Sequence, residues 1–506
     1  MRRSREGLLR GAPEPVRRSR KNASYRLASS PSARREIMEV LTANTMDPSK
    51  NERQVYDLVV HNAVLLTVDE KDHVIANGAI AIHDGLIVAV GYSRDILSRH
   101  DFREVIDAGG GILHPGFIDA HVHISQYTSR SVLSCMDGTS VTMGDWKSAL
   151  TPDDEHASAA LAAVDYLRSG YTGFVDPGTI FSPDAVAPVA DEFGIRIWLT
   201  DPYVADAGTE LQKHFPELVS ESFLALWPKN RDEAFRRLGS QLFRNKDRGS
   251  LVRAFVGLYG EGTDSQALFR TAFDLAREHG VQLQEHLGYA PLLYRQREFA
   301  LGASMMEHMS GEGVLDSHVT FVHMNAVHPG DVQILKARDV GIVWCPYGQL
   351  QMLGRGGAEG RMVELHRAGV KVGIASDIPR AVHFGGLGTL AAVTAAATGL
   401  AAWGHEILRM RTIGSAATVG AASELGSLEV GKRADFVVRR SDVSENLGLD
   451  PALEFAVIAD AGTIDSVFVD GKCVLRRGEV LKADRPAVIA RARQSVRGLA
   501  ARLHLA

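Results

Sequence analysis

The sequence has no apolar run long enough to cross a membrane. It also has no cysteine pattern that would cross-link a secreted fold through disulfides. No apolar stretch reaches the roughly 18 residues that a transmembrane helix needs, and no signal-peptide core follows the basic N-terminus. The 506 residues include only three cysteines, which are widely spaced: Cys135, Cys345 and Cys473. They offer neither a disulfide framework nor a CxxC metal site. We therefore expect a soluble, cytoplasmic protein with no membrane partner and no catalytic cysteine.

Most of the chain also lacks excess positive charge. The net charge is −5, but residues 1–35 hold eleven Arg and Lys against two Glu, which leaves −14 for residues 36–506. An acidic body gives little support to nucleic-acid binding. Segment 1–53 is rich in Arg, Ser and Pro and shows no apolar periodicity, which predicts a disordered extension. A flexible extension, or one read from an upstream start codon, is favoured over an organellar transit peptide.

The rest of the chain is longer than a single hydrophobic core usually supports, so one large domain and one smaller domain are expected. Between residues 114 and 425 helical and strand patterns alternate, which predicts a parallel sheet closed into a (β/α)8 barrel. Short β-runs with Asp-Gly and Asn-Gly turns at 54–113, and matching runs at 426–486, predict one small β-sandwich built from both chain ends. Residues 487–506 have the pattern of a basic helix. Within the barrel, helices are expected at 152–169, 183–193, 231–243, 265–279, 329–337 and 360–368.

The most informative stretch is His114-Pro-Gly-Phe-Ile-Asp-Ala-His-Val-His123. On a strand, period-2 alternation would point His121 and His123 the same way, as a pair of metal ligands. Taken alone, the pair could simply line a polar strand face. His286, His323 and Asp377 each end a later β-rich run. The carboxyl ends of barrel strands face one mouth, so all five side chains should converge there.

These motifs, together with Val343-Trp-Cys-Pro346 and the run from Gly426 to Val438, resemble the amidohydrolase superfamily over residues 55–480. The sequence is most similar to the branch of cytosine deaminases and triazine hydrolases. The resemblance implies that His121, His123, His286 and Asp377 contact a metal. It places His323 beside the metal, where it would touch the water or the substrate oxygen. Zn²⁺ is the expected ion, with Fe²⁺, Mn²⁺ and Co²⁺ left open by the ligand types.

One metal ion per chain is expected. Binuclear relatives carry a bridging lysine at the end of the fourth strand, and the corresponding run from Arg253 to Glu261 has no lysine. Glu261 is a candidate substitute bridge, although an acidic residue in a solvated loop is the simpler interpretation.

The sequence departs from the deaminase pattern three residues after His286. Deaminases of this branch carry a glutamate there, which protonates the ring nitrogen of the heterocycle, whereas this chain has Tyr289. Glu285 is a poor substitute because it neighbours His286 on the strand and points the opposite way. We predict Asp377, His323 and Tyr289 as catalytic residues, with Asp377 accepting the proton of the water. Aromatic residues near the predicted mouth loops are candidate substrate contacts: Tyr127, Trp146, Tyr289 and Phe384.

The missing glutamate favours a hydrolase of amide, urea, carbamate or thiocarbamate C–N bonds in a small, fairly hydrophobic substrate, as in phenylurea and molinate hydrolases. The alternative is a deaminase or dechlorinating hydrolase of an N-heterocycle such as cytosine, guanine or a triazine. A third hypothesis is a non-catalytic scaffold, although such proteins usually lose metal ligands and all five are present here. A homo-oligomer is expected by analogy with similar barrel enzymes.

Overall fold

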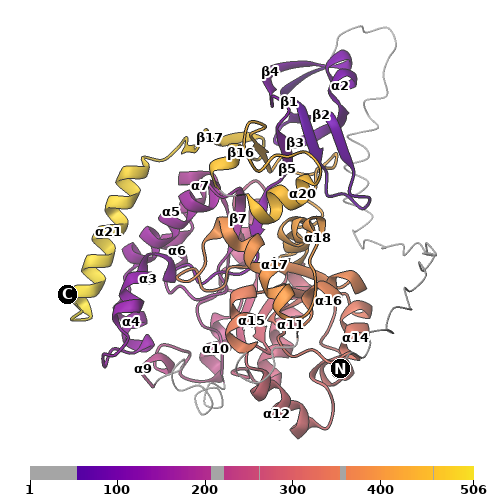
Figure 1. The fold of residues 1–506 in the computed structure, drawn as a ribbon. Coiled ribbons are helices and arrows are strands. Elements are labelled where there is room, and N and C mark those ends of the chain that lie inside the picture. The colour runs from indigo at the N-terminus through magenta and orange to yellow at the C-terminus, as the bar shows by residue number, and fades with distance from the viewer. Residues whose placement is uncertain (1–53, 207–220, 261, 354–359, 460, 506) are drawn as a thin grey trace, which may run out of the picture. The chain divides into compact units, whose positions relative to one another are not determined.

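The computed structural model describes residues 54–206, 221–260, 262–353, 360–459 and 461–505 (Figure 1). The extension predicted for residues 1–53 and the candidate bridge Glu261 lie outside the described residues. Within that part of the chain, none of the helices has both the length and the apolar character needed to span a membrane.

Nine short parallel strands carry the residues of interest and form two sheets. Every residue of β7 and β11 is buried, as is usual for parallel strands covered on both faces. One sheet contains β6 (Phe117–Asp119), β7 (Tyr171–Val175), β8 (Arg196–Leu199) and β9 (Val252–Ala254). The other contains β10 (Val256–Gly260), β11 (Leu283–Leu287), β12 (Val319–His323), β13 (Gly341–Trp344) and β14 (Lys371–Ile374).

The two sheets are linked at both edges. Only Phe255 separates β9 from β10. At the opposite edges, Val122 and Asp377 form an isolated parallel bridge, so the segment after β6 pairs with the segment after β14. The backbone N–H of Asp377 donates to the carbonyl of His121, and that of His123 donates to the carbonyl of Asp377. These bonds bring the ends of β6 and β14 together.

Helices alternate with these strands, as the sequence predicts. α5 (Pro152–Leu167) begins with a capping box in which Thr151 and Asp154 bond each other's backbone N–H groups, and Pro152 occupies the first turn. α11 (Gln266–His279) ends at Gly280, whose φ of 62° provides the left-handed cap. Other helices of this part are α3 (Gln126–Cys135), α4 (Met143–Ala149), α9 (Glu221–Leu224), α12 (Pro291–Leu301), α13 (Met305–Gly311), α14 (Asp331–Ala337), α15 (Pro346–Leu353), α16 (Met362–Ala368), α17 (Leu387–Ala397), α18 (Gly404–Arg409) and α19 (Ser415–Thr418).

Two predicted helices are shorter than expected. The segment 183–193 splits into α6 (Pro183–Val186) and α7 (Val189–Phe193), because Pro188 between them has no N–H to continue the ladder. The segment 231–243 ends as α10 (Arg231–Arg237), and a 3-10 turn follows at Leu242–Lys246. Gly239, with a φ of 81°, turns the chain between these two elements.

Strands from both chain ends share one nine-stranded sheet. β5 pairs antiparallel with β15, which joins the two arms. Phe436 and Phe468 stack with centroids 4.5 Å apart in a core that also contains Ile80 and Ile82 from the first arm. The strands are β1 (Val55–Leu66), β2 (Val74–His83), β3 (Leu86–Tyr92), β4 (Asp101–Asp107), β5 (Ile112–Pro115), β15 (Phe436–Arg439), β16 (Ile464–Val469), β17 (Lys472–Arg476) and β18 (Glu479–Val480).

The C-terminal helix α21 (Arg485–Arg502) covers the outer face of α3 and α5 (Figure 1). Leu499 is buried in a cluster with Val132 and Trp146. Ser495 donates from Oγ to Asp154 Oδ1 at 2.6 Å. The helix predicted at 487–506 begins two residues earlier, ends at Arg502 and packs against α3 and α5.

Candidate metal centre

The five residues predicted to meet at the strand ends do lie together. His121 and His123 follow β6, His286 lies in β11, His323 ends β12, and Asp377 follows β14. Ligand atoms of His121, His123 and His286 lie within 4.8 Å of one another. Asp377 Oδ1 is 3.0 Å from His123 Nε2 and 3.8 Å from His121 Nε2. The rings of His286 and His323 stack at 5.5 Å, which completes a cluster of four imidazoles and one carboxylate.

The two histidines of the opening motif reach this cluster differently than expected. β6 ends at Asp119, so His121 and His123 lie beyond the strand rather than on it. Their backbone stays extended because Val122 bridges Asp377 on one side and its N–H donates to the carbonyl of Val175 on the other. The i, i+2 spacing therefore still places both rings at one site, with their centroids 5.1 Å apart.

Hydrogen bonds orient two of the imidazoles. His121 donates from Nδ1 to Gln284 Oε1 at 2.9 Å, and His286 donates from Nδ1 to the carbonyl of Tyr259 at 2.7 Å. Each bond fixes the tautomer in which Nε2 carries the lone pair, as is usual for metal-binding histidines. His121 Nε2 is buried and has no hydrogen-bond partner among the described residues. Such a buried lone pair is typical of a ligand nitrogen.

Burial sets the charge state of the cluster. It lowers the pKa of His121 to about 3 and that of His323 to about 4, so both rings are neutral at pH 7. Burial alone would raise the pKa of Asp377, but the bond from His123 and the neighbouring imidazoles outweigh it, and the net shift is downward. The site therefore presents neutral imidazoles at His121, His286 and His323 beside the carboxylate of Asp377.

The backbone at two of these positions is strained. His323 has a φ of 81°, Met324 follows with 46°, and Asp377 has 58°. Side chains other than glycine rarely adopt this left-handed region, and such residues concentrate at functional sites. The hydrogen bond from Asp377 N to the carbonyl of His121 helps to hold this conformation.

The donor set fits a divalent metal ion. Three imidazoles and one carboxylate, with further positions open, match a catalytic site for zinc or a similar first-row ion. Comparison with known proteins agrees with a metal-dependent hydrolase site: residues 112–474 match the amidohydrolase family. The chain belongs to the amidohydrolase family. It is a metal-binding hydrolase.

Several relatives of this amidohydrolase are known. It is 26% identical to the 5-methylthioadenosine/S-adenosylhomocysteine deaminase of Pelotomaculum thermopropionicum, over 87% of this chain and 98% of that protein. The structure is similar to a zinc-bound adenosine deaminase from Xanthomonas campestris, with a TM-score of 0.75 at 22% identity over 89% of this chain and all of the other. It also matches the zinc-bound atrazine chlorohydrolase of Arthrobacter aurescens, with a TM-score of 0.72 at 23% identity over 87% of this chain and all of the other.

A second lysine-bridged metal has no support in the described strands. β9 and β10 contain no lysine. Cys345, to which the sequence assigned no role, lies with His323 and Asp377 such that their ligand atoms are within 4.8 Å of one another. Burial raises the pKa of the Cys345 thiol well above its usual value, which favours the protonated thiol in the metal-free protein.

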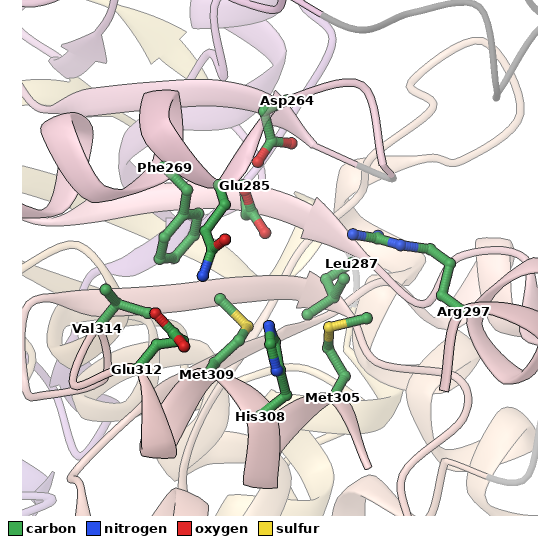
Figure 2. A pocket seen from close by; sticks show the side chains of 11 residues that line it. Asp264, Phe269, Glu285, Leu287, Arg297, Met305, His308, Met309, Glu312 and Val314 are labelled. Atoms are coloured by element: carbon green, nitrogen blue, oxygen red, sulfur yellow. The ribbon is translucent and has the colours of Figure 1, made fainter. Parts of the chain in front are cut away.

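Tyr289 lies at the cluster, at the position where deaminases of this branch carry glutamate. Its ring centroid is 4.9 Å from that of His323. Glu285 lies on the other face of β11, as predicted. Figure 2 shows Glu285 and Leu287 lining a separate cavity together with Phe269 of α11 and Met309 of α13. Glu285 therefore cannot act as the acid of the metal centre in this conformation.

Three of the four aromatic residues predicted to bind substrate lie in the core instead. Tyr127 and Phe384 stack at 4.9 Å and are 4% and 1% exposed. Trp146 is fully buried against α21, in the cluster of Val132 and Leu499. That Tyr127, Trp146 and Phe384 contact substrate was inferred from their positions in predicted loops, and it stays a prediction. Tyr289 alone of the four lies beside the cluster.

Two polar residues at the site were missed in the sequence. Gln284, two residues before His286, bonds His121, and the period of the strand could have revealed it. Lys147, next to Trp146, bonds Ser125, which lies two residues after His123. No motif marks Lys147, because a lysine in a short polar helix usually faces solvent.

Proposed function

We propose that this amidohydrolase is a zinc-dependent hydrolytic deaminase of an N-heterocycle with an exocyclic amino group, of the aminopurine nucleoside class. The deaminase and chlorohydrolase relatives support this proposal over our expectation of an amide, urea or carbamate substrate. The neutral histidines and ionised carboxylate of the cluster support one divalent ion per chain.

Each residue of the cluster has a role in this reaction. His121, His123, His286 and Asp377 would hold the metal, which would supply a Lewis acid and a water of lowered pKa. Asp377 accepts a proton from the attacking water and passes it to the leaving nitrogen. His323 and Tyr289, whose rings pack at 4.9 Å, hold the ring of the substrate in place. The Tyr289 hydroxyl relays the second proton of the water to the ring nitrogen, in place of the usual glutamate.

One observation carries this proposal. The carboxylate of Asp377 is 3.0 Å from His123 Nε2, and its pKa is held below the ordinary value. It is therefore ionised at neutral pH, and its position beside the imidazoles allows it to take a proton from the attacking water.

A substrate panel tests the proposal. The zinc-loaded protein is assayed for ammonia release from adenosine, 5′-methylthioadenosine, S-adenosylhomocysteine, cytosine, guanine and aminotriazines, and for amine release from anilides and arylureas. We expect ammonia from at least one aminopurine nucleoside. Amine release from the anilides or arylureas, without any deamination, would refute the proposal.

Hydrolysis of an amide or urea C–N bond remains the second candidate, and Tyr289 is the observation that favours it. A heterocycle must gain a proton on its ring as water attacks, which the usual glutamate provides. Amide and urea carbonyls need only polarisation and a protonated leaving amine, which the cluster supplies without that glutamate.

We further propose that the parallel strands close into a (β/α)8 barrel, in which β9 and β10 count as one strand interrupted at Phe255. The bridge between Val122 and Asp377 supports closure. The core shared by the two chain ends supports a small β-sandwich spanning 54–113 and 426–486, beside a barrel at 114–425. A cytoplasmic location and a homo-oligomer remain predictions, and light scattering of the purified protein tests the second.

A further inference from the structure

A buried lysine lies beside the metal-binding residues and has no role in the proposed reaction. Lys147 of α4 is 4% exposed. Its Nζ donates to Ser125 Oγ at 3.0 Å and to the carbonyl oxygen of Thr179. Ser125 follows His123 by two residues, and Thr179 follows Asp176 by three. The amine therefore lies between the two loops that leave the carboxyl ends of β6 and β7, the end of the sheet where the metal-binding residues gather.

The chain compensates the charge of this amine only in part. Both acceptors are neutral, and no carboxylate oxygen of the described residues lies within 4.0 Å of Nζ. Glu155 and Asp176 stabilise the charge from farther away, while burial lowers the pKa of Lys147 to about 8. Backbone N–H groups occupy those carboxylates, including those of Phe181 on Glu155 and Thr179 on Asp176.

One donor of the amine is left over. An ammonium group has three N–H donors, and the described residues accept two of them. A buried cation whose donors are not all bonded is costly, so proteins keep such a group where a further partner meets it.

Aromatic rings surround the amine. Nζ lies 4.7 Å from the ring centroid of Trp146, 5.2 Å from that of Tyr203 and 5.7 Å from that of Phe181. Phe181 and Tyr203 stack at 4.9 Å. The amine is therefore a buried polar group among aromatic rings.

Contacts between aromatic rings continue from Tyr203 to the metal cluster. Tyr203 lies 6.0 Å from Tyr259, and the ring of Tyr259 lies 5.5 Å from His286. Trp227 packs on Tyr259 at 4.6 Å, and its buried Nε1 has no hydrogen-bond partner among the described residues. A largely apolar surface with a few polar anchors, leading to a catalytic group, is what a flat heterocyclic ligand requires.

We propose that Lys147 is a specificity-determining residue that donates its third N–H to a hydrogen-bond acceptor of the substrate, a planar heterocycle lying along the rings of Tyr203 and Tyr259. This inference rests on the proposed function for its substrate class. Lys147 selects substrates that carry a lone pair at one position, on a ring nitrogen or on a hydroxyl oxygen. Trp146, predicted as the substrate contact, packs into the core, and its neighbour Lys147 takes that role.

A purely structural role makes a different prediction. If Lys147 only pins the loop after His123 through Ser125, its loss would slow every substrate by one factor. Ser125→Ala, which removes the hydroxyl acceptor but keeps the amine, would then reproduce the defect. A substrate contact instead makes the defect depend on which acceptor the substrate carries.

The test compares Lys147→Met with the wild type on substrates that differ by one acceptor. Zinc-loaded proteins are assayed for kcat/KM on adenosine, its 1-, 3- and 7-deaza analogues, and its 2′-, 3′- and 5′-deoxy analogues. Ser125→Ala is assayed alongside. Lys432→Met is the matched control, because the Lys432 amine also donates to a serine hydroxyl, Ser427 Oγ at 2.6 Å, in the segment that leads to β15.

We expect Lys147→Met to lower kcat/KM by about 10- to 100-fold on the full substrate, the range for a hydrogen bond from a charged donor. The substitution should lower kcat/KM far less on the one analogue that lacks the contacted acceptor, because the wild type already turns over that analogue poorly. Lys432→Met should behave as wild type. An equal loss on every substrate, a loss reproduced by Ser125→Ala, or no loss at all would overturn the inference.

Two further measurements keep the outcome decisive. If Lys147→Met is insoluble, Lys147→Gln retains a donor and should keep part of the discrimination, whereas uniform kinetics in it overturn the inference. If the wild type deaminates none of these compounds, the proposed function fails, and the same comparison is made on equilibrium Kd values by calorimetry. Acceptor-dependent weakening of binding in the variant supports the role of Lys147, and uniform or absent binding refutes it.

Discussion

His121 donates its Nδ1–H to the side-chain oxygen of Gln284 across 2.9 Å. Gln284 in turn donates from Nε2 to the carbonyl of Ala120 at 3.2 Å, so both ends of its amide are fixed. Gln284 precedes His286 by two residues on β11, and both side chains face the same side of the strand. β11 therefore provides one candidate ligand, His286, and orients another, His121, which follows β6.

Removing this oxygen should weaken metal binding. In Gln284→Leu the Nδ1–H of His121 loses its acceptor, so the ring is free to rotate or change tautomer. We expect about a 10- to 100-fold loss of zinc affinity, the usual effect of losing such a partner. Competition with a chromophoric chelator measures it. Gln282→Leu is the control, because Gln282 bonds Ser317 and Thr320 instead of a histidine of the cluster. Unchanged affinity in Gln284→Leu would exclude the orienting role.

Replacing His323 should separate chemistry from metal binding. His323 is 3% exposed, and its Nδ1 has no hydrogen-bond partner among the described residues. If it contacts the substrate beside the metal, His323→Asn should lower kcat by about 100-fold or more while the zinc content stays at one per chain. Elemental analysis beside steady-state kinetics checks this. A parallel loss of zinc and kcat would make His323 a ligand.

The stability of the metal-free protein should fall on acidification. Burial holds the folded-state pKa of His121 at about 3 and that of His323 at about 4, below the ordinary value of 6.5. The unfolded chain binds these protons first as the pH drops below 6.5, so the stability present above that pH is lost toward pH 4. Each group contributes a slope of up to about 1.4 kcal/mol per pH unit. Urea unfolding from pH 7 to 4.5 measures it, and His323→Asn should have the shallower slope. Equal slopes would show that His323 does not titrate in this way.

The sequence predicts the convergence of the site well because its signals are local. Each of His286, His323 and Asp377 ends an apolar run, and parallel strands deliver their carboxyl ends to one edge. The hairpin of β2 and β3 is similarly local, because Asp84 and Gly85 take φ values of 49° and 75° in the turn between them. The pairing of β5 with β15 has no such local signal, and only the family resemblance pointed to it.

The sequence does not predict which loop residues face the site. A loop has no fixed period, so Trp146 and Lys147 were equally able to face the metal cluster. Docking of α21 places Trp146 in a cluster with Leu499 and Leu503, whereas the amine of Lys147 reaches Ser125 and Thr179. This contact joins α4 to α21, which lie about 350 residues apart in the chain, and no local sequence pattern predicts it. The stacking of Tyr127 on Phe384 was likewise not predictable, because the two residues lie far apart in the chain.

The strongest test of the mechanism is Asp377→Asn. The amide preserves size and can keep an oxygen toward the metal, but it cannot accept a proton from water. Turnover should fall by at least the roughly 10²- to 10⁴-fold attributed to general acid–base catalysis, and zinc content should fall less than in His121→Ala. If Asp377 only caps the loop after β14, asparagine would cap nearly as well and activity would survive. Steady-state kinetics at matched zinc occupancy distinguish these cases. Turnover near that of the wild type would overturn the proton-transfer role, even with the metal site intact.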